Sequence, residues 1–248
     1  GMESWPIDHH VIEGNPAEED FWVNVAEYLD RRYVQAWHGG TLGIDATSID
    51  SGHHTQAVYN FVRLQQHLRR IYAIKGSSED GKTIKGTASS MEVNWRGQKW
   101  QHGVKLWVIG TDTAKDLLHG QLAIDKPGPG FVHFSEDLPR EWYEQLTAEQ
   151  RITVRTPSGD RQRWVKRRPR NEVLDCRNYA VHAAIQLGLD SYTTARWQRL
   201  LQAVQPPRDL FSMEPSPPLV IEPPKVIAPA ARMPIAPPQP IRPTGRQW

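Results

Sequence analysis

The sequence predicts a mixed α/β fold, because segments with strand character alternate with amphipathic helical segments over residues 4–203. The 248-residue chain is long enough for one large domain or two small ones. Most of its 20 prolines lie between Pro206 and Pro243, and proline at that density excludes helices and central strands. We therefore expect one folded domain over residues 4–203 and an extended, disordered proline-rich tail over residues 204–248.

The first expected elements are a short strand over residues 4–13 and a helix that begins at Asn15. Asn15 is a favoured N-cap, Pro16 suits the first helical position, and Glu18 completes a capping box. The apolar face of this helix consists of Phe21, Trp22, Val25, Ala26, Leu29 and Tyr33. Their helical spacing predicts that this face packs against a core.

The remaining elements follow from apolar runs and their periodicity. Strands are expected over residues 41–50, 70–75, 104–109, 131–134, 152–156 and 161–166. Helices are expected over residues 55–68, from Thr111 onwards, and over residues 138–146 and 171–187. The sequence Pro-Ser-Gly-Asp at 157–160 has the composition of a hairpin turn. Residues 76–103 are rich in Gly, Ser and Lys and are expected to be irregular.

Composition excludes several classes of protein. The net charge is only +2, so only a local basic cluster can mark a nucleic-acid surface. The single cysteine, Cys176, excludes an internal disulfide framework and a cysteine-rich zinc site, and it fits a reducing, cytoplasmic compartment. The sequence shows no signal peptide and no apolar run of membrane-spanning length, so no membrane partner is expected.

Asp50 is the first candidate for a functional carboxylate. It closes the expected strand 41–50, directly before Ser51 and Gly52, and a charge at such a place is costly to bury unless it is paired or bound to a metal ion. An Asx turn with Ser51 and Gly52 explains the residue equally well. Asp45 lies at an odd spacing on the same strand, so it points to the opposite face and is interpreted as a surface or pairing residue.

Glu172 and Asp175 share one face of the expected last helix. Acids near a helix N-terminus commonly complement the helix dipole, and the residues alone favour that interpretation. With Asp50, they are also the ligand type for Mg²⁺ or Mn²⁺ in two-metal phosphodiester hydrolysis, although a full set usually needs one more carboxylate. His53 and His54 follow Asp50 and are candidates for contacts with water or phosphate, or for helix capping and packing.

The segment from Gly76 to Thr83 matches the Walker A pattern of phosphate-binding loops. A working loop needs a helix directly after it, whose amide groups hold the phosphates. The following Ile-Lys-Gly-Thr-Ala-Ser sequence starts a helix poorly, and Glu79 and Asp80 would repel phosphate. An ATPase built on this loop is therefore a minor alternative, and no nucleotide is expected.

A basic cluster precedes the last expected helix. It consists of Arg161, Arg163, Lys166, Arg167, Arg168 and Arg170, with Trp164 interleaved. Such a cluster is either a solvated edge strand that resists aggregation or a grip on the phosphates of DNA. Its position beside Glu172 and Asp175 favours the phosphate grip, and nothing in it indicates readout of base sequence.

Five short motifs occur in one order, over residues 49–55, 72–76, 109–115, 129–134 and 170–176. In that order they resemble the C-terminal nuclease domain of the lambda-type (GpA) large terminase family of tailed phages. The resemblance implies a ribonuclease-H-like mixed sheet flanked by helices. It also implies a Mg²⁺- or Mn²⁺-dependent endonuclease that cuts concatemeric double-stranded viral DNA in the bacterial host cytoplasm during packaging.

The resemblance assigns Asp50 to the acidic end of the fourth strand and Asp175, with Glu172 nearby, to the acidic helix motif. It further implies the portal protein, engaged by the tail, and the small terminase subunit as partners. The chain is expected to depart from the family pattern, without a separate ATPase domain, and to begin at the third strand, without the first two strands and the first catalytic aspartate. An inactive protein that only binds DNA or portal therefore remains the alternative, and an exposed sheet edge would favour self-association.

Overall fold

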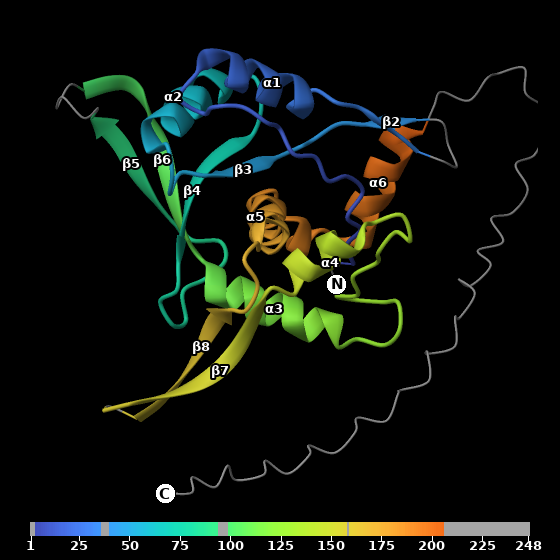
Figure 1. Ribbon diagram of the computed structural model, residues 1–248. Coiled ribbons are helices and arrows are strands. Elements are labelled where there is room, and N and C mark those ends of the chain that lie inside the picture. The colour runs from blue at the N-terminus through green and yellow to red at the C-terminus, as the bar shows by residue number, and fades with distance from the viewer. Residues whose placement is uncertain (1–2, 36–39, 94–98, 158, 206–248) are drawn as a thin grey trace, which may run out of the picture. The chain divides into compact units, whose positions relative to one another are not determined.

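A four-stranded mixed sheet forms the centre of the fold in the computed structural model. The structure describes residues 3–35, 40–93, 99–157 and 159–205, without the side chains of residues 92–102. The sheet contains β3 (Thr47–Asp50), β4 (Ile71–Ser77), β6 (Lys99–Gly110) and β5 (Thr87–Val93), in that order (Figure 1). β3, β4 and β6 run parallel, and β5 is antiparallel. The C-terminal ends of the three parallel strands therefore lie together, where binding sites of α/β proteins commonly form.

Helices α1 (Glu19–Leu29) and α2 (Thr55–Gln65) lie over one face of this sheet (Figure 1). The buried cluster beneath them consists of Val58, Phe61, Val62, Ile71, Ala73 and Val104, with Trp22, Val25, Ala26 and Leu29 of α1 packed against it. Successive side chains of a strand point to opposite faces, so Ile71 and Ala73 face these helices while Tyr72 faces away. Burying a large apolar side chain such as Phe61 contributes about 1.5–3 kcal/mol to folding.

Helix α5 (Glu172–Gln186) covers the opposite face, and His182 anchors it there. The His182 side chain is fully buried, its Nδ1 lies 2.8 Å from Ser48 Oγ of β3, and its ring contacts those of Tyr72 and Trp107. Gln186 Nε2 donates to the Lys85 carbonyl at 2.9 Å and lies 3.0 Å from His182 Nε2. Both ring nitrogens of His182 therefore have hydrogen-bonding partners, Ser48 at Nδ1 and Gln186 at Nε2.

A second apolar cluster joins α5 to α3 (Thr111–Leu122) and α4 (Arg140–Leu146). It consists of Leu118, Val132, Trp142, Leu146, Val173 and Leu174. Strands β7 (Glu149–Thr156) and β8 (Gly159–Lys166) form an antiparallel hairpin that projects from this part of the molecule (Figure 1). At its base, Trp164 Nε1 donates to Asp116 Oδ1 at 2.9 Å, and Arg151 pairs with the same oxygen at 2.7 Å. These contacts fix the base of the hairpin to α3.

The first expected elements differ from those observed. Residues 4–13 form no regular strand, and only an isolated parallel bridge joins Ser4 to Val132, within the expected strand 131–134. Helix α1 begins at Glu19, because Asn15 closes a separate turn instead: its carbonyl accepts from Glu18 N at 2.9 Å, and its side chain accepts from Ala17 N at 3.0 Å. Asn15 Nδ2 also donates to Glu18 Oε1 at 3.1 Å, so the two predicted capping residues meet through their side chains one turn before the helix.

Two further expectations on the middle of the chain also need correction. The expected strand 41–50 is interrupted: β2 (Thr41–Leu42) pairs with β1 (Tyr33–Val34), and β3 begins only at Thr47. Residues 76–103 are less irregular than expected, because they contain β5 and the beginning of β6. β5 lacks an apolar pattern but gains ladder hydrogen bonds from β6, which no local signal reveals.

The chain then continues through a short 3-10 turn, η1 (Leu189–Ser191), into α6 (Thr194–Val204). Thr193 caps α6 by accepting from Arg196 N. Most of the expected proline-rich tail, residues 206–248, lies outside the described residues. Among the helices that the structure describes, none combines the length and apolarity needed to cross a bilayer.

The buried histidine makes stability depend on pH. Burial lowers the pKa of His182 to about 4 from its ordinary 6.5, so between these values the unfolded chain binds a proton that the folded chain does not. We therefore expect the free energy of unfolding to fall by about 2 kcal/mol from pH 7 to pH 5 through this residue. Urea denaturation at both pH values should show a smaller loss in His182→Gln; an identical loss in both proteins would contradict the assignment.

Candidate functional site

Asp50 lies at the C-terminal end of β3, where its carboxylate is exposed. Gly52 N donates to Asp50 Oδ1 at 3.0 Å, so the Asx turn considered from the sequence is present. A Cβ on Gly52 would lie 3.3 Å from the same oxygen, so glycine leaves room for the carboxylate. Tyr179 of α5 lies 3.4 Å from Asp50 Oδ2 through its hydroxyl. Asp50 therefore faces α5 while it also closes its own turn.

Asp175 lies near the N-terminus of α5 and is half-buried. Burial, together with the nearby charges of Glu149 and Asp50, raises its pKa to about 6 against the opposing effects of Lys115 and Lys166. Burial also raises the pKa of Tyr179, and the charges of Asp50 and Asp175 both contribute. The structure therefore brings Asp50 and Asp175, which are far apart in the sequence, into one acidic site.

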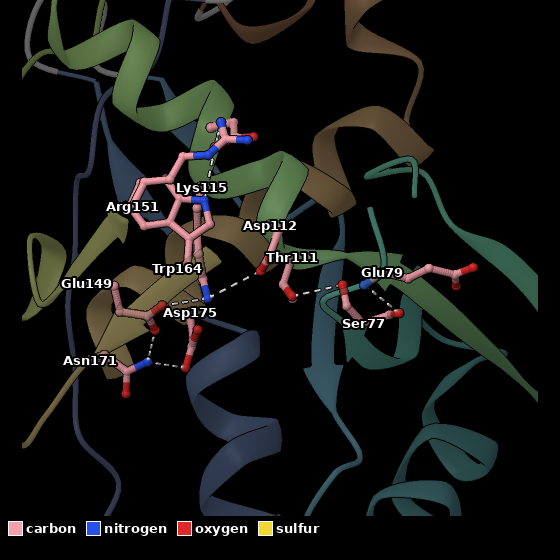
Figure 2. A network of polar contacts seen from close by, with 11 residues as sticks. Ser77, Glu79, Thr111, Asp112, Lys115, Glu149, Arg151, Trp164, Asn171 and Asp175 are labelled. Atoms are coloured by element: carbon pink, nitrogen blue, oxygen red, sulfur yellow. Dashed lines mark hydrogen bonds and ion pairs between the residues drawn. The ribbon is translucent and has the colours of Figure 1, made fainter. Parts of the chain in front are cut away.

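A polar network supports Asp175 from three other segments (Figure 2). Lys115 Nζ of α3 donates to Glu149 Oε2 of β7 at 2.7 Å. Asn171 Nδ2 donates to the other Glu149 oxygen at 2.9 Å and to Asp175 Oδ2 at 3.1 Å. Lys166 Nζ donates to Asn171 Oδ1 at 2.7 Å. Asp175 thus belongs to a chain of contacts that links α3, the hairpin and α5.

Sequence reasoning missed Lys115, Glu149 and Asp112 as members of this site. Lys115 also lies 3.9 Å from Asp112 Oδ1, and burial raises the pKa of Asp112, with contributions from Asp116 and Glu149. Asp112 and Lys115 follow directly on β6, so the rule that parallel strands end on one side of a sheet could have identified them. Glu149 carries no comparable local signal.

Glu172 does not join the network of Asp175. Its exposed carboxylate pairs with Arg170 Nε at 3.3 Å. Partial burial would raise its pKa, but its own backbone amide, Arg170 and Lys166 bring the pKa below the ordinary value. A role in binding metal would require this side chain to leave Arg170, so the predicted role of Glu172 remains a proposal.

The two histidines after Asp50 have exposed side chains, and their rings contact each other with centroids 5.5 Å apart. His54 occupies the N-cap position of α2 in a left-handed conformation, with φ of 49°, and its side chain makes no capping hydrogen bond. The helix-capping alternative considered for His54 therefore holds for its backbone position only. Asp45 is exposed and outside any strand, in agreement with its interpretation as a surface residue.

The predicted basic cluster is divided among three environments. Arg161 and Arg163 lie opposite Val154 and Ile152 in the hairpin, on the face that does not carry Trp164. Lys166 belongs to the network of Asp175, and Arg167 donates its backbone N–H to the Ala148 carbonyl at 2.7 Å.

The other two basic residues pair with acids of α4. Arg168 lies 3.6 Å from Glu144, and Arg170 lies 3.0 Å from Glu141. Their charge is therefore partly compensated. Of the cluster members on the hairpin, Arg161 and Arg163 lie on the face opposite Trp164, whereas Lys166 contacts Asn171.

Asp50 and Asp175 fit a divalent cation in donor type and in charge. Hard carboxylate oxygens suit Mg²⁺ and Mn²⁺, and the charges of Asp50 and Glu149 act on Asp175 in addition to its burial. In the part of the chain that the structure describes, no three acid, histidine or cysteine side chains converge closely enough to hold an ion. These two aspartates are therefore the candidate ligands, and other ligands have to come from water, substrate or rearranged acids.

The Walker-like segment has no helix after it, in agreement with its rejection from the sequence. Residues Thr87–Val93 form strand β5, and Lys82 pairs with Glu79 at 3.0 Å within the loop. The amide groups of a helix N-terminus, which hold phosphate in such loops, are therefore not supplied here.

Replacement of Asp175 by asparagine should stabilise the folded protein, although it removes a candidate metal ligand. Ionised Asp175 opposes folding above its folded pKa of about 6, because the unfolded carboxyl loses its proton at lower pH. After allowance for solvent screening, we expect Asp175→Asn to be more stable by about 1–2 kcal/mol at pH 7.5 in EDTA. The gain should shrink as the pH falls below about 6 and vanish well below 3.8, where the carboxyl is neutral in the folded and in the unfolded chain; thermal denaturation that shows a loss at pH 7.5 would contradict the assignment.

Comparison with known proteins gives the same family as the motifs. Residues 1–197 match the family described as terminase large subunit gpA, endonuclease domain. The chain is 31% identical over 214 residues to the terminase large subunit of Escherichia phage lambda, which covers 82% of this chain and 31% of that protein. It is 27% identical over 226 residues to the terminase large subunit of Enterobacteria phage P21, which covers 87% of this chain and 33% of that protein.

The chain spans about a third of the length of these curated relatives. No solved structure matches it. The match to the family description covers most of the described residues, including Asp50, the Lys115 network and Asp175. The chain therefore belongs to the endonuclease-domain family of gpA-type terminase large subunits.

Proposed function

We propose that this domain is a Mg²⁺- or Mn²⁺-dependent endonuclease that cuts concatemeric double-stranded viral DNA. Membership of the terminase nuclease-domain family supports hydrolysis of nucleic acid in general. The observation that carries the finer proposal is the meeting of Asp50 and Asp175 in one acidic site, where each aspartate comes from a separate element.

In this proposal, Asp50 and Asp175 bind the metal through carboxylate oxygens. A bound ion would activate water and stabilise the leaving oxygen of the phosphodiester. Asn171 holds Asp175 by a hydrogen bond of 3.1 Å, and Gly52 N holds Asp50 at 3.0 Å, so both carboxylates are oriented before substrate arrives. Glu172 is proposed as a further ligand in a two-metal site, which would require its release from Arg170.

The hairpin is the proposed DNA-binding arm. It projects from the body of the domain, and it carries Arg161 and Arg163 on its exposed outer part (Figure 1). Its base reaches the acidic site through Lys166 and Asn171. Backbone phosphates held by the two arginines, with Arg167, Arg168 and Arg170 nearby, would keep a duplex close to the carboxylates without readout of its sequence. His53 and His54 are exposed beside Asp50 and are proposed to contact water or phosphate.

A second candidate is a protein that binds DNA or portal without cutting. It is favoured by one observation: within the described residues, no three metal-ligating side chains converge. An ATPase function of the segment from Gly76 to Thr83 is not supported, because strand β5 follows that segment.

The proposed partners are double-stranded DNA, the portal protein and the terminase small subunit, in the cytoplasm of a bacterial host. Self-association is proposed as well, because β3 is an edge strand of the sheet. The outward backbone groups of an edge strand can pair with another chain.

Nicking of supercoiled plasmid tests the proposed chemistry. We expect cleavage with Mn²⁺ or Mg²⁺ to fall by roughly two orders of magnitude or more in Asp50→Asn and in Asp175→Asn, because each removes a ligand charge. Asp45→Asn is the matched control, since Asp45 is an exposed acid in the same segment. A similar loss of cleavage in Glu172→Gln would support Glu172 as a further ligand, and unchanged cleavage would speak against that role. Absence of cleavage by the unmodified protein, with DNA binding retained, would favour the non-catalytic alternative.

Salt-dependent DNA binding tests the role of the hairpin. Each lost phosphate contact reduces the slope of log affinity against log salt concentration by about 0.9, so Arg161→Ala with Arg163→Ala should reduce it by roughly 1.8. The matched control removes the same number of charges from α6, by Arg196→Ala with Arg199→Ala. An equal reduction in slope for both double variants would show that the hairpin has no special part in binding.

A further inference from the structure

Lys115 is a largely buried lysine whose charge acts on Asp175, the candidate metal ligand of α5. Its side chain is only 11% exposed and its partner Glu149 only 8%, and their charged atoms lie 2.7 Å apart. Asp112 Oδ1 lies 3.9 Å from the same ammonium group. Lysine and glutamate are rarely buried unless paired, and removal of one partner from a buried pair is strongly destabilising. The ammonium group thus neutralises acids that would otherwise repel each other in a poorly hydrated place.

Both oxygens of Glu149 are already engaged. Oε2 accepts from Lys115, and Oε1 accepts from Asn171 at 2.9 Å (Figure 2). Glu149 cannot turn towards a metal ion without losing one of these contacts. Its position therefore suits a supporting role behind Asp175 better than direct coordination.

Asn171 makes the connection to the metal-binding carboxylate. It occupies the N-cap position of α5, where asparagine normally bonds to the backbone of its own helix, but its side chain makes no such contact. Its amide group donates to Glu149 and to Asp175 instead, and its oxygen accepts from Lys166. The Asn171 side chain therefore orients the Asp175 carboxylate instead of capping the helix backbone.

We propose that Lys115 is a positioning residue that serves as the resident cation of the acidic site, holding Glu149 and, through Asn171, the Asp175 carboxylate beside Asp50 before a divalent ion binds. This inference rests on the proposed function, in which Asp175 is a metal ligand. The ammonium group supplies the positive charge that keeps the acids together in the free protein. A bound divalent ion would supply part of that positive charge.

Thermal denaturation of Lys115→Met in EDTA and in excess Mn²⁺ tests the proposal. Methionine fills similar space without charge, so the melting temperature in EDTA should fall by roughly 5–10 °C. Excess Mn²⁺ should raise the melting temperature of Lys115→Met more than that of the unmodified protein. Lys115→Arg keeps the charge and should lose less than half as much in EDTA.

Arg69→Met is the matched control, because Arg69 forms a partly buried pair with Asp30 at 3.1 Å, far from the acidic site in the fold. It should lose stability without any additional gain from Mn²⁺. If Lys115→Met does not fold, Lys115→Met with Glu149→Gln should fold, because the buried carboxylate is no longer unpaired. A double variant that also fails to fold would overturn the proposal.

The outcomes separate this inference from the proposed function. Equal stabilisation of the unmodified protein and of Lys115→Met by Mn²⁺ would still support the metal site. It would show that Lys115 forms only an ordinary salt bridge, and it would overturn this inference without affecting the proposed function. An unchanged melting temperature of Lys115→Met in EDTA would overturn it as well. Absence of stabilisation of either protein by Mn²⁺ would remove the metal site, and the inference with it.

Discussion

The contact between His182 and Ser48 fixes α5 on the sheet, and the acidic site depends on it. His182 is fully buried, and its Nδ1 lies 2.8 Å from Ser48 Oγ on β3. Asp175 lies about two turns towards the N-terminus of the same helix, and Asp50 lies at the end of the same strand. Because helix and strand are stiff, one buried contact between them sets where their two carboxylates meet, and Tyr179 on the intervening turn touches Asp50.

The acidic site is maintained against its own electrostatic repulsion. Burial raises the pKa of Asp175 and of Asp112, and neighbouring acids raise both further. Lys115 opposes this for both carboxyl groups, and Lys166 does so for Asp175. A cluster held in this way lowers the stability of the free protein, and such clusters are typical of functional sites, where a bound cation relieves the repulsion.

The hairpin shows how strand geometry divides a basic sequence into separate roles. Trp164 and Lys166 lie on one face, where they contact Asp116 and Asn171 and attach the hairpin to the site. Arg161 and Arg163 pair with Val154 and Ile152 on the other face and are exposed. The alternation of side chains along a strand thus separates the residues that anchor the arm from those available to a ligand.

The sequence by itself determined the α/β class and most helices, and it nominated the two aspartates as candidates, because strand ends and helix starts carry local signals in polarity and spacing. It did not determine β5, whose residues lack an apolar pattern and pair only because β6 lies beside them. Only the tertiary structure joined Lys115, Glu149 and Asn171 to Asp175, and only it directed Glu172 towards Arg170. These contacts join side chains from α3, β7 and α5, and hydrogen bonds between distant segments form only after the packing of those elements has set their positions.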